Sequence, residues 1–295
     1  MPILPTPHPS KATIVSRQGR SRIVECESVA PMRFLSPYFS EEAASLILSS
    51  YGGGMVQGDR IAIDLHIEKD ARLFLGTQAN SRVYKNDRDL PTSQIITAKV
   101  DEGAKAVFLP DPLVLHKGSR FHQQQHWQVA PHAGLLIGEW FQCGRSDSGE
   151  CFAYHEYDSL IEISGEEGLW IREPFSSKPE GQDPRQTGRF GDANLMLTLF
   201  AVGEAQPLLR EALEVFAQGQ REYTQVPVLS EKEIRSSPTD LRAWVQLEDR
   251  PVSIYRALGK TRADFDPLWR ALEKVLATPD WLGPEAQLPM CRQSV

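Results

Sequence analysis

The sequence has only four cysteines in 295 residues, and none of them forms a CxxC pair: Cys26, Cys143, Cys151 and Cys291. The first ten residues also lack the apolar stretch that a secretory signal peptide needs. Scattered cysteines without such a signal are typical of free thiols in a reducing compartment. We therefore expect a cytoplasmic protein.

Clustered basic residues and long hydrophobic runs are missing as well. Lys and Arg number 32 against 39 Asp and Glu, which gives a net charge of −7 with histidine neutral. Because nucleic acid binding needs grouped cations that neutralise phosphates, we expect no nucleic acid partner. The longest uncharged run, residues 43–58, is interrupted by serines and four glycines, so it predicts no membrane span.

The chain does have enough apolar sequence for a large core, with 41% hydrophobic and 24% charged residues. It shows no repeat and no clear boundary, so we predict one domain over residues 1–295. Four prolines among the first nine residues predict a loose arm over residues 1–10. Three prolines and three glycines between Glu173 and Asp192 predict a long loop over residues 173–192.

Period-two hydrophobic patterns indicate that most of the chain forms β-strands. In the clearest case, residues 61–67, four aliphatic side chains alternate with polar or small ones and therefore share one face. Weaker patterns of the same kind predict strands over residues 22–29, 72–77, 104–109, 121–129, 160–164, 169–172, 241–247 and 252–258.

Two late segments follow a helical period instead. Apolar residues recur on one stripe over residues 206–217, and again over residues 266–276. Asp266 is the predicted N-cap of the second helix, and Pro267 its predicted first residue. The residues alone thus predict one β-rich domain with two helices in the C-terminal third.

The most unusual segment is glycine-rich, residues 51–59. It is not a phosphate-binding loop, because no Lys-Ser or Lys-Thr pair follows and the next element is a strand. The pattern favours a turn in which glycines adopt positive φ. Asp59, at the end of this turn, is either a turn-capping carboxylate or a metal ligand.

Histidines are frequent between residues 116 and 132, but their spacing does not predict a shared metal site. His122 and His126 lie on a predicted strand, where four residues span roughly 13 Å, too far for one metal ion. We expect them, with residues 123–125, on the exposed polar face of a sheet. The sequence also has no serine hydrolase elbow, zinc protease motif or calcium loop, so it predicts no catalytic residue.

Four short blocks occur in an order and spacing that resemble the urease accessory protein D family (UreD, also called UreH). They are Gly53-Gly54-Met-Val-Gln-Gly58-Asp59, the block from Gly76 to Tyr84, the block from Gly103 to Pro112, and Gly138-Glu139 followed by Gly144-Arg145 and Gly149-Glu150. The resemblance covers nearly the whole chain. Three positions depart from the family pattern: Gly76 replaces a common Thr, Arg82 a common Lys, and Phe108 is unusual in its block.

The resemblance implies a mainly β fold of stacked sheets, β-helical or sandwich-like, with two late helices. It implies a scaffold and not an enzyme. The implied partners are the urease apoprotein, the urease accessory protein F and, through F, the accessory GTPase G. The implied cargo is Ni²⁺, bound transiently and passed through an internal tunnel, with no tightly bound cofactor.

The resemblance also implies roles for particular residues. Three carboxylates are the candidate nickel ligands along the path: Asp59, Glu139 and Glu150. Further residues of the tunnel or its motifs are Gly53, Gly54, Gly58, Thr77, Gln78, Tyr84, Pro110 and Arg145. The alternative is structural: Asp59 and Glu150 then cap turns, and Arg145 neutralises a buried carboxylate.

Two other functions stay open at this point. A β-sandwich that binds or hydrolyses carbohydrate needs two carboxylates about 5–10 Å apart in one cleft, and only Glu139 and Glu150 are candidates. Trp127, Trp140 and Trp170 are then the candidate sugar-stacking residues. A stable metal store needs a dense ligand motif, which the sequence lacks. For binding of protein F, we expect an exposed apolar patch after residue 276, with Trp281, Leu282, Leu288 and Met290.

Overall fold

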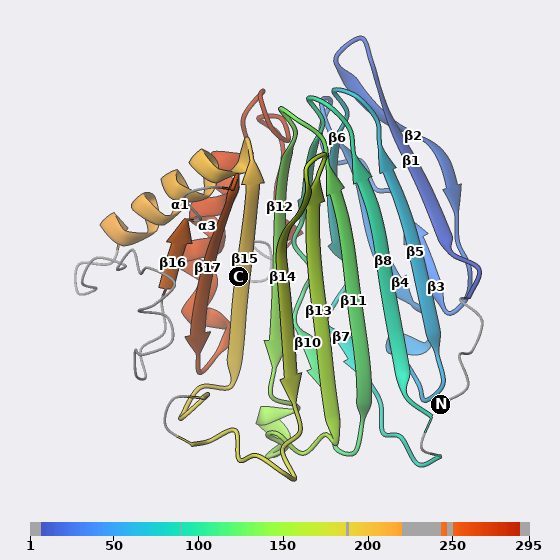
Figure 1. Ribbon diagram of the computed structural model, residues 1–295, viewed down its shortest axis with the longest axis vertical. Coiled ribbons are helices and arrows are strands. Elements are labelled where there is room, and N and C mark those ends of the chain that lie inside the picture. Colours follow the sequence, from blue (N-terminus) through green and yellow to red (C-terminus); the bar gives the residue numbers. More distant parts are fainter. Residues whose placement is uncertain (1–6, 89, 187–188, 220–242, 247–249, 290–295) are drawn as a thin grey trace.

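The computed structural model describes residues 7–88, 90–186, 189–219, 243–246 and 250–289. Two β-sheets lie face to face, and two helices cover the outer face of one of them (Figure 1). One hydrophobic core fills the space between the sheets, and a second lies between the helices and their sheet. The protein thus has three layers, in the order sheet, sheet, helices.

Within the described residues, one sheet has seven strands. Their spatial order is β14 (Gly168–Ser177), β13 (Glu156–Gly165), β11 (Arg120–Val129), β8 (Thr92–Val100), β5 (Arg60–Ile67), β1 (Ser10–Arg17) and β2 (Arg20–Glu27). The other sheet has ten strands in the same described ranges. Eight follow the order β16 (Ala243–Gln246), β17 (Val252–Gly259), β15 (Leu195–Gly203), β12 (Gly134–Gln142), β9 (Lys105–Phe108), β6 (Arg72–Thr77), β4 (Ala44–Ser50) and β3 (Met32–Leu35), and β7 (Ser81–Val83) and β10 (Leu113–Leu115) lie beside them.

The middle of the chain alternates between the two sheets. In the ten-stranded sheet, the successive parallel neighbours are β4, β6, β9 and β12. In the seven-stranded sheet, they are β5, β8, β11 and β13. Parallel neighbours need a crossover connection, and each crossover here runs through the opposite sheet. The result is a β-helical centre with antiparallel strands added at its ends. The predicted mainly β fold with stacked sheets and two late helices is confirmed.

The two sheets differ in how many of their faces are buried. In β5 the inward residues Ile61, Ile63, Leu65 and Ile67 are at most 4% exposed, whereas Asp64 and His66 point outward. In β12 and β15, eight of nine residues are buried, because one face meets the other sheet and the opposite face meets the helices. Strands buried on both faces lose the period-two pattern. This is why the sequence did not predict β12 or β15.

The helices are α1 (Ala205–Gly219) and α3 (Asp266–Leu276), and they pack against each other and the ten-stranded sheet. Trp140 of β12 lies against Trp269 of α3, with ring centroids 5.0 Å apart. The predicted start of α3 is wrong by one residue, because Asp266 is already helical and Phe265 holds the N-cap position. The capping box lies one turn earlier, where Thr261 and Asp264 cap the N-terminus of the 3-10 helix η3 (Arg262–Phe265). No helix in the described ranges is long and apolar enough to cross a membrane.

Three predicted segments differ in the structure. The loop predicted over residues 173–192 begins only at residue 178, because β14 continues to Ser177. Pro174 is compatible with this strand because β14 is the edge of its sheet. Ser10, predicted in the loose arm, is the first residue of β1, and residues 1–6 of that arm lie outside the described residues. The expected apolar patch is also wrong: Trp281, Leu282 and Leu288 are buried against the helices and sheet, while Met290 is not described.

We expect Trp269→Ala to lower the free energy of unfolding by about 3–5 kcal/mol, because it leaves a cavity beneath α3 where the side chain is 1% exposed. Urea unfolding followed by circular dichroism measures this change. The control is Leu169→Ala on β14, where the side chain is 49% exposed and we expect a change within about 0.5 kcal/mol. Equal effects of the two variants would contradict the packing described for α3.

Candidate functional site

A polar cavity of about 100 Å³ lies between the two sheets. Some of its lining residues are exposed, among them Gly53, Gln78 and Arg82, whereas Gln125, Glu139 and Tyr157 line it and are buried. The cavity therefore leads from the surface into the interior. A polar site needs about 10–15 Å³ for each water position, so this volume has room for several water molecules.

The polar lining on one side comes from the inner face of the seven-stranded sheet. Along β11, Phe121, Gln123, Gln125 and Trp127 share the inward face, as the period of two requires. Gln94 of β8 lies at the register position of Gln123 and lines the cavity beside it. The prediction that residues 123–125 lie together on an exposed face is wrong for Gln123 and Gln125. Their alternation with Phe121 and Trp127 was the signal that places them inside.

Glu139 projects into the cavity from the ten-stranded sheet and is 7% exposed. Its neighbours on the same face of β12 are Ile137 and Phe141, both in the core between the sheets. Three side chains of the opposite sheet donate hydrogen bonds to its Oε1: Gln123 (3.3 Å), Tyr157 (3.1 Å) and Ser159. Among the described residues, none donates to Oε2, so this oxygen is available to a further partner.

Burial raises the pKa of Glu139 above its usual value, although the hydrogen bonds from Ser159 and Tyr157 and the charge of Arg256 act in the opposite direction. Burial likewise raises the pKa of Tyr157 well above its usual value, and the neighbouring Glu139 carboxylate adds to this. The phenol therefore stays a hydrogen-bond donor at neutral pH. The cavity thus contains a carboxyl group that can take up a proton or attract a cation.

A second polar group lies where β6 and β9 end. Asp111, with its side chain 4% exposed, accepts a salt bridge from Arg262 at 2.7 Å. Its backbone N–H donates to the Thr77 hydroxyl at 2.7 Å, and that hydroxyl in turn donates to the Asp111 carboxylate at 3.3 Å. The Arg262 guanidinium also lies over the Trp140 ring, 5.4 Å from its centroid. Arg262 therefore neutralises Asp111, and Glu139 is the lining carboxylate without an ion pair in the described residues. No motif in the sequence pointed to Arg262.

The glycine-rich segment forms a turn beside the cavity, as its composition predicts. Gly52, Gly53 and Gly58 all have positive φ, between 71° and 81°. Gly54 is extended, but a Cβ there would lie 2.7 Å from Cε2 of Tyr84. The Tyr84 hydroxyl donates to the carbonyl of Gly53 at 3.3 Å. These family-motif residues therefore fix the turn, and only Gly53 of them lines the cavity.

Two of the three candidate nickel-ligating carboxylates lie outside the lining. The Asp59 carboxylate accepts the backbone N–H of Val56 at 2.8 Å and so caps the glycine-rich turn. Glu150 forms a two-oxygen salt bridge with Arg145 in the loop between β12 and β13, and this contact lowers its pKa. The cavity lining includes the predicted Gly53, Thr77, Gln78, Pro110 and Glu139, and it does not include Gly54, Gly58, Asp59, Tyr84, Arg145 or Glu150.

Comparison with known proteins gives a consistent result. The chain is 28% identical over 270 residues to a urease accessory protein UreD of Cytophaga hutchinsonii, covering 90% of this chain and 92% of that protein. It is 31% identical over 205 residues to a urease accessory protein UreD of an Anaeromyxobacter species, and the match covers 69% of this chain and 68% of that protein. It is 29% identical over 258 residues to urease accessory protein UreD 2 of Streptomyces griseus, covering 83% and 84%. The profile of the UreD urease accessory protein family matches residues 10–293, and the chain therefore belongs to that family.

Proposed function

We propose that this protein is a non-catalytic accessory factor in the maturation of urease, and that it helps deliver nickel to the urease active site. In this proposal it binds the urease apoprotein and the accessory protein F, and through F the accessory GTPase G. Family membership supports the role in maturation. The observation that carries the nickel proposal is the polar cavity with a buried carboxylate at its inner part.

The cavity has the chemistry that a passing nickel ion requires. Oxygen ligands hold Ni²⁺ less tightly than thiolates or several imidazoles do, so they permit release. Amide, hydroxyl and carboxylate oxygens line the cavity. Gln78, which is exposed, and Thr77 lie at its outer part, and the buried Gln125 and Glu139 lie at its inner part. We propose that the free Oε2 of Glu139 contacts the hydrated ion, while Gln123, Tyr157 and Ser159 hold the carboxylate in place. Nickel is then cargo and not a resident cofactor.

A cytoplasmic site of action fits the cysteine chemistry. Cys26, Cys143 and Cys151, the cysteines within the described ranges, are free thiols. Burial raises the pKa of Cys143 to about 12, and the neighbouring Cys151 adds to this. The thiolate form, which binds soft metals, is therefore rare at neutral pH. This supports a nickel route along oxygen atoms and not through the Cys143 thiol.

The carbohydrate alternative receives no support from the geometry. Glu139 lines the cavity, while Glu150 lies outside it and is bound to Arg145. Trp127 and Trp140 are each 2% exposed, so neither offers a ring face on which a sugar can stack. Trp170 is half-buried on β14 and does not line the cavity. The candidate carboxylate pair and the candidate stacking residues therefore do not meet in one cleft.

The direct test is urease activity in cells that lack this gene but make the urease subunits and receive nickel. We expect abundant but inactive urease, and recovery of activity when the gene is restored. Copurification with tagged apo-urease and tagged accessory protein F tests the partners separately. Full urease activity without the gene would contradict the proposed role in maturation.

We expect Glu139→Gln to reduce urease activation by roughly tenfold or more, the scale of effects near metal-binding groups. The amide keeps an oxygen that accepts the three hydrogen bonds but loses the negative charge. The measurement is urease activity together with urease-bound nickel in the complemented cells. Glu150→Gln is the comparison, because it removes the other candidate carboxylate, and we expect it to retain activation. Loss with Glu150→Gln but not with Glu139→Gln would contradict the assignment.

The same variant should change the pH dependence of stability. Because the pKa of Glu139 is raised in the folded protein, its contribution to stability is present below the unfolded value of about 4.3 and is lost as pH rises through the folded value. The glutamine of Glu139→Gln does not titrate, so the variant does not lose stability in this way. Thermal unfolding should therefore show the variant gaining stability relative to the original protein as pH rises through the folded value of Glu139. A difference that is constant with pH would contradict the raised pKa.

A further inference from the structure

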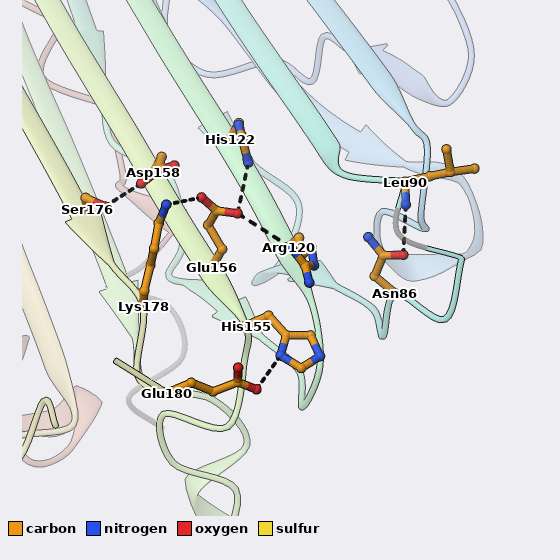
Figure 2. A network of polar contacts seen from close by, with 10 residues as sticks. All are labelled: Asn86, Leu90, Arg120, His122, His155, Glu156, Asp158, Ser176, Lys178 and Glu180. Carbon is orange, nitrogen blue, oxygen red and sulfur yellow. Dashed lines mark hydrogen bonds and ion pairs between the residues drawn. The ribbon is translucent and has the colours of Figure 1, made fainter. Parts of the chain in front are cut away.

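A cluster of one imidazole and two carboxylates lies on the outer face of the seven-stranded sheet (Figure 2). His122 of β11 and Asp158 of β13 are direct neighbours in the parallel register, and Glu156 lies two residues before Asp158. The period of two places Glu156 and Asp158 on the same face. One ligand atom from each of the three residues lies within 4.8 Å of the others.

The cluster brings two negative charges close together beside an imidazole nitrogen that has no hydrogen-bond partner. Nε2 of His122 is buried and unsatisfied, and it lies 3.7 Å from Oε2 of Glu156, too far for a hydrogen bond. Burial acts to raise the pKa of Glu156, but contacts with Lys178, Asp158 and His122 outweigh it and the pKa is lowered. Asp158 accepts a hydrogen bond from Ser176 at 2.6 Å, and no salt bridge in the described residues includes it.

We propose that His122, Glu156 and Asp158 form a binding site for a divalent first-row transition metal ion. The ligands are Nε2 of the imidazole and one oxygen from each carboxylate, with water at the remaining positions. A mixed set of imidazole and carboxylate suits Zn²⁺, Co²⁺ or Ni²⁺ and not Ca²⁺ or Mg²⁺, which prefer oxygen ligands alone. One ion would neutralise both carboxylates and bind the unsatisfied nitrogen.

Lys178 is the competing cation of this site. Its ammonium lies 2.6 Å from Oε1 of Glu156, and Arg120 approaches the other oxygen at 3.9 Å. The Lys178 side chain is 57% exposed, so it can move into solvent when a metal ion binds. Lys178 follows directly after β14 (Figure 2), and metal binding would thus release the contact that holds the start of the following loop to β13.

The same two strands provide a matched control site. His126 and Glu162 occupy the same register relation four residues further along, with Nδ1 and Oε2 3.0 Å apart. The residue that corresponds to Glu156 there is Leu160, and Arg172 already binds Glu162 at 3.1 Å. The exposures are also alike, 37% for His126 and 42% for His122. The control pair therefore lacks the second carboxylate and should not bind the ion.

The proposed metal site is separate from the cavity. His122 and Gln123 are consecutive but point to opposite faces of the sheet, so the cluster faces outward while Gln123 contacts Glu139 inside. The metal site does not depend on the proposed route of nickel. Its test therefore needs no urease and gives an answer whether or not the maturation proposal holds.

The test is titration of the purified full chain, without an affinity tag, with Zn²⁺ by isothermal calorimetry, and with Co²⁺ by visible absorption. We expect His122→Ala and Asp158→Asn each to weaken Zn²⁺ binding at least tenfold, and His126→Ala to leave it within twofold. Lys178→Met should tighten it severalfold, because it removes the competing charge.

Circular dichroism of each variant shows whether it is folded. If His122→Ala does not fold, Asp158→Asn still tests the site, because asparagine has a similar shape and the position is partly exposed. The proposal is overturned if the original protein shows no saturable binding up to millimolar Zn²⁺. It is equally overturned if Asp158→Asn binds as tightly as the original protein, or if His126→Ala loses as much affinity as His122→Ala.

Discussion

The ten-stranded sheet has to be covered on both faces, and most other features of the structure follow from this constraint. The seven-stranded sheet covers one face, and α1 and α3 cover the other. The strands in its middle are accordingly apolar along both faces, and the helices carry the tryptophan and leucine side chains that pack on them. A charged group in the middle of β12 is buried between two layers. Glu139 is that group, and three donors from the facing sheet stabilise it.

The polar cavity interrupts an otherwise apolar interface between the sheets. Burying amides, hydroxyls and a carboxylate is costly unless they are hydrogen-bonded, and apolar side chains at Gln123, Gln125 and Glu139 would continue the surrounding core. The chain belongs to the UreD urease accessory protein family, and the transport of a hydrated ion that we propose gives these buried polar groups a use. The same reasoning separates Glu139 from Asp59, which caps a turn, and from Glu150, which pairs with Arg145.

The sequence predicts best the strands that have one solvent-facing side. β5 and β11 were identified nearly to their ends because their side chains alternate. β6 is buried on both faces and was identified as well, because turn residues bound it. β12 and β15 were not, because burial on both faces removes that pattern. The cavity was harder still: it depends on which strands face each other across the two sheets, and no local pattern brings Glu139 opposite Ser159. The partner of Asp111, Arg262, is 151 residues away along the chain, and short-range analysis does not find such a pair.

The central claim is that nickel passes through the space between the sheets, and blocking that space tests it most directly. Gln94→Trp fills the cavity from the inner face of β8, and Thr97→Trp adds the same bulk on the exposed outer face of that strand. The measurement is nickel content and activity of urease in complemented cells, with partner binding checked by copurification. We expect the Gln94→Trp protein to bind its partners but fail to activate urease, and the Thr97→Trp protein to activate it normally. Normal activation by a folded Gln94→Trp protein would contradict the account.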